Sequence, residues 1–156
     1  MDVGRRVLLK GAGATGVAAA ALAAGLLKPQ RVLAAEWDKD AFRAKTAADA
    51  LKQIGAADAA ESKDLFMDAP QIAENGAVVP VEVSSSIPGT KSLSIVVDKN
   101  PFPLSAKFDF EEGALPYVKV NLKMGQTSTV RAIAEANGKH YVATREVKVT
   151  IGGCGG

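Results

Sequence analysis

Residues 128–151 read STVRAIAEANGKHYVATREVKVTI. The second half of this stretch alternates apolar and polar side chains, the period-two pattern of a half-buried strand. The apolar positions are Tyr141, Val147, Val149 and Ile151, and the polar ones are Glu146, Lys148 and Thr150. Asn137-Gly138 separates the two halves, and both residues tolerate the positive φ that a type I′ turn requires. The stretch therefore predicts a long β-hairpin.

The same alternation recurs upstream. Apolar residues with polar neighbours such as Ser92 and Ser94 form four more runs: Val81 and Val83; Leu93, Ile95 and Val97; Phe108 and Phe110; and Val118, Val120 and Leu122. Turn-forming residues interrupt these runs at 75–76, 88–89, 98–101 and 111–113. Regular turns and about seven short strands predict a mainly β protein, an immunoglobulin-like antiparallel β-sandwich over residues 64–151.

An amphipathic helix is predicted before the strands, over residues 36–55. Its apolar positions follow helical spacing and share one face: Phe42, Ala47, Ala50, Leu51 and Ile54. Asp38 or Asp40 suits the cap at its start, and Gly55 suits the left-handed position after its end. The apolar face must cover either the protein's own domain or a partner subunit.

Residues 1–35 have the layout of an export signal that is removed by cleavage. Arg5, Arg6 and Lys10 precede an apolar run, and small residues follow at 34–35. The adjacent arginines in RRVLLK match the twin-arginine signal, which a receptor reads as an address. The run from 11 to 27 is near the lower limit for spanning a bilayer. Because it is mostly alanine and glycine, we expect cleavage after position 34 or 35, a periplasmic protein and no permanent membrane anchor.

Charge and composition argue against several function classes. The chain has 19 basic and 17 acidic residues, and residues 1–35 hold five of the basic and one of the acidic ones. The remainder is therefore slightly acidic, with no basic patch for nucleic acid. His140 is the single histidine, and no cluster of ligand residues predicts a metal site or another cofactor. Met67 and Met124 are predicted to pack in or beside the core.

The chain ends in a glycine tail that carries its one cysteine. Cys154 lies between Gly152-Gly153 and Gly155-Gly156. Glycine has no Cβ and adopts positive φ without strain, so these pairs predict a flexible, swinging arm over residues 152–156. A thin arm of this kind can bring a thiol into narrow pockets of other proteins.

The surroundings of Cys154 favour an attachment point over a catalyst. A catalytic cysteine needs a helix N-terminus, a cation or a paired base to ionise it. Its neighbours here are glycines and the terminal carboxylate of Gly156, which disfavours a thiolate. We therefore predict no catalytic residue in this chain and a carrier that acts as a substrate of partner enzymes.

Several segments resemble the SoxY family, the sulfur-carrier subunits of the periplasmic thiosulfate-oxidising Sox system. The specific mark is the ending VKVTIGGCGG at 147–156, after a twin-arginine signal, an early helix and a β region. The stretches AFRAKTAADAL at 41–51 and AENGAVVPVEV at 73–83 are also similar to that family. The resemblance covers essentially the whole chain.

The resemblance implies covalent carriage of thiosulfate-derived adducts and a persulfide on Cys154. It implies a heterodimer with a SoxZ-like subunit, loading by a SoxAX-like haem enzyme, and removal of sulfate by a SoxB-like hydrolase. A SoxCD-like sulfane dehydrogenase oxidises the remaining sulfur in some systems. The carrier itself holds no metal and no haem.

Two alternatives use the same tail differently. Cys154 could link an exported interaction module to a partner through an intermolecular disulfide. The terminal Gly-Gly could instead carry sulfur as a thiocarboxylate, but that route needs cytoplasmic ATP-dependent activation, which the export signal argues against. A tail without a role is the remaining alternative.

Overall fold

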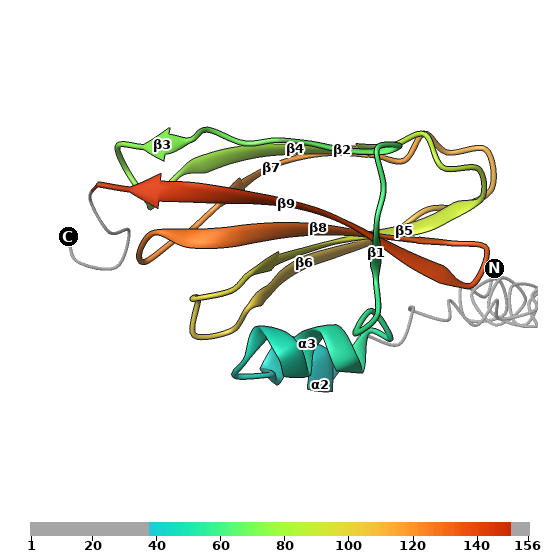
Figure 1. Cartoon of the computed structure of the whole chain (residues 1–156), viewed down its shortest axis with the longest axis horizontal. Coiled ribbons are helices and arrows are strands. Elements are labelled where there is room, and N and C mark those ends of the chain that lie inside the picture. Colours follow the sequence, from blue (N-terminus) through green and yellow to red (C-terminus); the bar gives the residue numbers. More distant parts are fainter. Residues whose placement is uncertain (1–37, 151–156) are drawn as a thin grey trace, which may run out of the picture. The chain divides into compact units, whose positions relative to one another are not determined.

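The computed structural model describes residues 38–150, and within this range it contains two helices and nine strands. The helices are α2 (Lys39–Arg43) and α3 (Ala47–Gln53). The strands are β1 (Ala60–Glu61), β2 (Leu65–Asp68), β3 (Ile72–Ala73), β4 (Val79–Ser85), β5 (Thr90–Val97), β6 (Leu104–Asp109), β7 (Tyr117–Leu122), β8 (Ser128–Ala136) and β9 (Lys139–Val149). The predicted mainly β, immunoglobulin-like sandwich is confirmed (Figure 1). Seven of the strands have four or more residues, as predicted, and β1 and β3 have two each.

Two sheets form the sandwich. The larger has the order β1-β9-β8-β5-β6, with β3 also paired to β9, and the smaller has the order β2-β4-β7. Most pairs are antiparallel, but β1 and β3 run parallel to β9, one near each of its ends. Parallel pairing arises because the chain leaves the edge of β9 after β1, forms β2 in the other sheet, and returns to the same edge as β3. The sandwich therefore begins at Ala60, a few residues before the predicted start at 64.

The predicted hairpin is present as β8 and β9. The strands pair from Ser128↔Val147 to Ala136↔Lys139. Asn137 has φ 53° and Gly138 has φ 71°, so both turn residues adopt the left-handed conformation of the predicted type I′ turn. Ile151, the last predicted apolar residue of the strand, lies outside the described residues.

The core lies between the two sheets, where the apolar positions of the alternating strands meet. Val81 and Val83 of β4 are fully buried against Leu93, Ile95 and Val97 of β5. Met67 and Met124 belong to the same cluster, with 5% and 0% of their surface exposed, so their predicted core packing is confirmed.

The prediction that β5 is buried on one face was wrong. Ser92 and Ser94, the polar half of its alternation, are 5% and 3% exposed. The reason is a third layer: α2 and α3 cover the outer face of the larger sheet (Figure 1). Ser92 keeps a hydrogen-bond partner there, because its hydroxyl donates to Glu135 Oε2 at 3.3 Å.

The two helices pack on this domain itself, which settles what their apolar face covers. Ala41 and Ala50 are fully buried in a second cluster with Val96 of β5 and Leu104 of β6. The partly buried residues around this cluster include Phe42, Leu51 and Ile54. Of the two alternatives for the apolar face, the structure shows the domain and not a partner subunit.

The prediction of one continuous helix over 36–55 was also wrong. The helical path breaks at Ala44–Thr46, and Thr46 adopts extended backbone with φ −125° and ψ 152°. The Thr46 hydroxyl accepts a hydrogen bond from Asp49 N at 3.1 Å and donates to Asp49 Oδ2 at 2.7 Å. Thr46 is therefore the N-cap of α3, and its hydroxyl starts a new helix where propensity alone would continue the first one. Among the described residues, no helix is long and apolar enough to cross a membrane.

Candidate functional site

The site residues predicted from sequence lie outside the described part of the chain. These are the attachment residue Cys154, the arm glycines Gly152, Gly153, Gly155 and Gly156, and the export-signal residues Arg5 and Arg6. The structure does describe the root of the tail, because its last described residue is Thr150. The Cα of Cys154 follows four residues later, so it lies at most about 14 Å from the Cα of Thr150.

The root of the tail is held by backbone and hydroxyl hydrogen bonds up to its last described residue. Lys148 N donates to Gln71 O at 2.9 Å, and Thr150 N donates to Ala73 O at 3.1 Å, so β3 fixes one side of β9. Val149 N donates to Thr127 Oγ1 at 3.0 Å on the other side. The tail therefore starts from a fixed point at one end of the sandwich.

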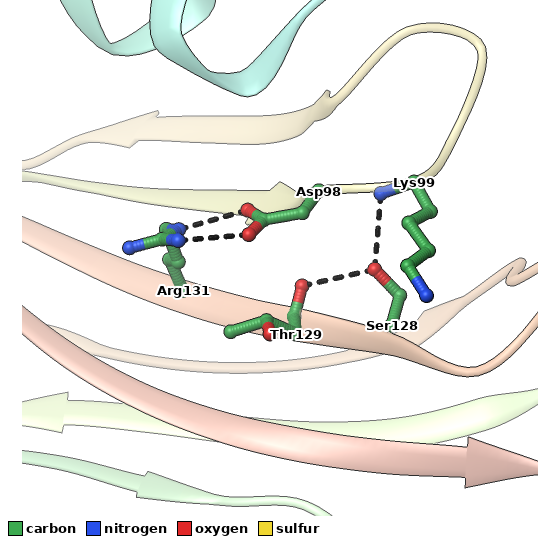
Figure 2. Close-up of polar contacts among 5 residues, drawn as sticks. All are labelled: Asp98, Lys99, Ser128, Thr129 and Arg131. Carbon is green, nitrogen blue, oxygen red and sulfur yellow. Dashed lines mark hydrogen bonds and ion pairs between the residues drawn. The ribbon is translucent and has the colours of Figure 1, made fainter.

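A polar cluster fixes the adjacent turn between β5 and β6 (Figure 2). Arg131 on β8 donates from Nε and Nη2 to the two carboxylate oxygens of Asp98, each at 2.8 Å. This two-bond contact holds the pKa of Arg131 above its ordinary value, since the Asp98 carboxylate stabilises the charged guanidinium. The contact therefore holds the Asp98 side chain in one orientation just after the end of β5.

Two further hydrogen bonds, each between a backbone group and a side chain, fix the rest of that turn. Lys99 N donates to Ser128 Oγ at 3.0 Å, and Figure 2 shows this contact beside the Arg131–Asp98 pair. Asn100 reaches across to the chain after β7, because its Nδ2 donates to Lys123 O at 2.8 Å. Ser128 is paired with Val147 near the end of β9, so this turn lies at the same end of the sandwich as the tail root.

The charges around the tail root are mixed, with an excess of lysine. Lys99, Lys123 and Lys148 are exposed at this end, and Glu74 and Glu146 are the exposed carboxylates beside β9. Arg145, Glu146 and Lys148 also line a surface cavity of about 420 Å³ next to β3. The negative charge of Asp98 is balanced by its ion pair with Arg131, so Asp98 does not add to the exposed carboxylates at this end.

The described residues show no arrangement of side chains for a metal ion, because no group of three or more His, Cys, Asp or Glu side chains among them could hold one. His140 is partly buried, and its ring lies near Gly55 after α3, since a Cβ on Gly55 would stand 3.3 Å from His140 Cε1.

Sequence reasoning missed the Asp98–Arg131 pair and the anchoring of the tail root. The sequence pattern marks Asp98 only as a turn residue, because its partner Arg131 lies 33 positions later in the chain. Thr127, which holds Val149, gave no signal because an isolated threonine before a strand has no distinctive pattern.

This arrangement defines a two-sheet β-sandwich with a helical layer and a held C-terminal strand from which a thiol-bearing tail continues. The family model described as "Sulfur oxidation protein SoxY" matches residues 51–154, so the match extends to Cys154. The chain belongs to the SoxY family.

Solved structures agree with this family. The chain is similar to the sulfur carrier protein SoxY from Chlorobium limicola f thiosulfatophilum, with 39% identity and a TM-score of 0.62, over 72% of this chain and 99% of that one. It is also similar to superoxide reductase (neelaredoxin) from Ignicoccus hospitalis E23A, with 22% identity and a TM-score of 0.50, over 63% of this chain and 86% of that one. The second likeness shows the fold alone. No match was found among curated proteins.

Proposed function

We propose that this protein carries sulfur intermediates covalently on Cys154 and presents them to separate enzymes of thiosulfate oxidation. The observation that carries the proposal is the family match, which extends to the single cysteine of the chain. A relative that is 39% identical is titled a sulfur carrier protein. The protein itself acts as a substrate and not as an enzyme.

The chemistry requires two steps on the thiol. In loading, the Cys154 sulfur and the outer sulfur of thiosulfate form an S–S bond, one proton leaves, and two electrons pass to a SoxAX-like haem enzyme. In release, water attacks the sulfonate sulfur under a SoxB-like hydrolase, and the S–S bond to the sulfonate breaks. The persulfide sulfur keeps the electron pair of that bond and takes one proton of the water, while sulfate leaves and the other proton is released. A persulfide then remains on Cys154. A SoxCD-like enzyme oxidises that sulfur further where it is present.

The geometry of the tail root supports this role. A short tail that starts from a fixed strand end can present its thiol to enzymes that differ in shape, while the sandwich stays unchanged. The sulfonate of the loaded form is an anion, and the three exposed lysines at this end favour negative charge nearby. The proposed SoxZ-like subunit completes a heterodimer, and the protein acts in the periplasm after twin-arginine export.

The test is the intact mass, without reductant, of protein purified from cells grown on thiosulfate, followed by peptide mapping. We expect an adduct of one or more sulfur atoms, with or without sulfonate, on Cys154, and its loss on reduction. The Cys154→Ser variant should carry none. A bare thiol, or a dominant disulfide-linked dimer, would instead support an interaction module joined through Cys154.

A truncation separates the thiol from the terminal carboxylate as the sulfur-bearing group. Removal of Gly155 and Gly156 leaves Cys154 in place, so we expect the adduct to persist on the cysteine. Complete loss of the adduct in this variant, with Cys154 still reactive toward a thiol reagent, would favour a thiocarboxylate carrier.

A further inference from the structure

A large cleft lies at the end of the sandwich opposite the tail root. Its volume is about 890 Å³, and three turn regions enclose it: the β4–β5 turn, the β6–β7 loop and the end of β8. In Figure 1 the β8–β9 turn and the end of β9 lie at opposite ends of the strands. Since β9 has 11 residues, about 33 Å separates the cleft end from the tail root.

The walls of the cleft are held by hydrogen bonds, so its shape exists before any ligand binds. Thr90 Oγ1 donates to Ile87 O at 2.7 Å, and Phe110 N donates to Lys91 O at 2.8 Å. Asn137 Nδ2 donates to Pro88 O at 2.8 Å, which ties the β8–β9 turn to the β4–β5 turn. A preformed site loses less conformational entropy on binding.

The cleft is acidic, with apolar side chains on its wall. Four carboxylates line it (Asp109, Glu111, Glu112 and Glu135) against the single cation Lys91, while Ile87 and Phe110 supply apolar surface. Asp109 has a long ion pair of 3.8 Å with Lys107. A complementary ligand for this cleft is positively charged and partly apolar.

An exposed apolar strip adjoins the cleft on the outer face of the smaller sheet. Leu115, beside the cleft residues Ala114 and Pro116, is 78% exposed. Tyr117 and Phe66 are 44% and 60% exposed, and both pair with Ser84 of β4, from opposite sides. Paired side chains on adjacent strands stand about 5 Å apart, so Phe66 on β2 and Tyr117 on β7 lie on either side of Ser84, the polar residue of the central strand. Exposed apolar surface beside a cleft of this kind is typical of a protein interface and not of a small-molecule site.

We propose that the acidic cleft and the adjoining strip form a docking surface for a partner protein that inserts a basic segment into the cleft. The carboxylates select the charge of the segment, and Leu115, Tyr117 and Phe66 provide the apolar contact around it. Because the surface is remote from the tail root, a partner bound there leaves the tail accessible and can stay bound while Cys154 is loaded and unloaded. The surface does not depend on what Cys154 carries.

The direct test uses the full chain and a synthetic eight-residue peptide of alternating lysine and leucine. Amide chemical shifts should change for the non-proline residues of 85–91 and 109–115, and the peptide with glutamate in place of lysine should cause no such change. Glu111→Gln with Glu112→Gln should weaken binding about fivefold, because one exposed ion pair contributes a factor of roughly 1.4 to 5. The matched control, Glu61→Gln with Glu74→Gln, removes two exposed carboxylates that do not line the cleft and should leave the affinity unchanged.

Photo-crosslinking in cells tests the partner itself. A photoreactive residue at Leu115 should yield one protein adduct whose crosslinked segment is basic, and the same residue at the exposed Val78, before β4, should not. Calcium alone reproducing the shifts, a dimer of this chain that the glutamate variants dissociate, or an acidic crosslinked segment would each overturn the proposal. Sulfur on Cys154 is measured separately, so failure here leaves the carrier function standing.

Discussion

At the scale of single residues, the Asp98–Arg131 pair is the best-defined polar contact near the tail root. Arg131 Nε and Nη2 both donate to the carboxylate. The Asp98 side chain is 22% exposed and the Arg131 side chain 34% exposed, so water only partly competes for these hydrogen bonds. A two-bond contact between Arg and a carboxylate also fixes direction, which a single lysine contact does not. The pair joins β8 to the turn after β5.

Replacing Asp98 with alanine should destabilise the protein by about 1 to 3 kcal/mol, because the partly buried Arg131 then loses both charged hydrogen bonds. Urea unfolding at neutral pH measures this difference. The control is Lys107→Met, which removes the long, exposed contact to Asp109 and should cost less than about 0.5 kcal/mol. Equal effects of the two substitutions would contradict a special role for the Asp98 pair.

Alanine substitutions at Gly89 and Gly113 separate the cost of backbone strain from the cost of a steric clash, because the two glycines have similar backbone conformations and different surroundings. Gly89 has φ +72° and Gly113 has φ +83°, so an alanine at either is strained by about 1 to 2 kcal/mol. A Cβ at Gly89 would also stand 2.7 Å from Asn137 Oδ1, whereas nothing lies within 4 Å at Gly113. Gly89→Ala should therefore be less stable than Gly113→Ala by roughly another 1 kcal/mol, since Asn137 must move and weaken its bond to Pro88. Thermal unfolding of the two variants checks the order, and equal melting temperatures would contradict it.

At the scale of elements, strands were predictable from sequence and the helical layer was only partly so. Alternation in β4 and β7, and Asn137-Gly138 between β8 and β9, are local signals, and the structure confirms them. The burial of Ser92 and Ser94 could not be predicted, because it depends on helices that are distant along the chain. The break before Thr46 had a usable signal, the Thr46-Ala-Ala-Asp49 capping pattern.

A cross-strand network on the smaller sheet gives stability that depends on pH. Glu82 on β4 accepts hydrogen bonds from Lys119 and Tyr117 on β7, and these partners, Lys119 first, hold the pKa of Glu82 below its ordinary value of 4.5. A carboxylate whose pKa is lower in the folded state than in the unfolded state makes its full contribution to stability at pH values above its unfolded-state pKa. That contribution is lost as the pH falls through the folded-state pKa.

The urea midpoint of the wild-type protein should therefore exceed that of Glu82→Gln by a constant amount above about pH 5. The difference should shrink as the pH falls below 4.5. In a Lys119→Met background, most of this pH dependence should disappear, because the first partner of Glu82 is gone. A difference between the midpoints that grows toward low pH would contradict the assignment.

At the scale of the whole molecule, the tail root and the acidic cleft lie at opposite ends of the sandwich. They are joined by the length of β9. The assignment of Cys154 as the attachment residue rests on sequence and stays a prediction: a lone cysteine between two glycine pairs is distinctive without any fold. The cleft was not predictable from sequence, since its walls come from turns that are far apart in sequence, and Glu111-Glu112 gave only a turn signal.

The predicted export signal at residues 1–35 determines where the whole chain is delivered, and it can be tested at Arg5 and Arg6. We propose that an export receptor reads the two arginines of RRVLLK as a pair, so changing Arg5 and Arg6 to lysine keeps the charge of the segment and should abolish export. Cell fractionation should then find the variant in the cytoplasm at the mass of the uncleaved chain, and we expect the wild-type protein in the periplasm, beginning at position 35 or 36. The matched control is Arg31→Lys, which makes the same chemical change outside the pair and should leave export intact. Periplasmic protein at the wild-type level in the double variant would mean that the segment is read by another export route.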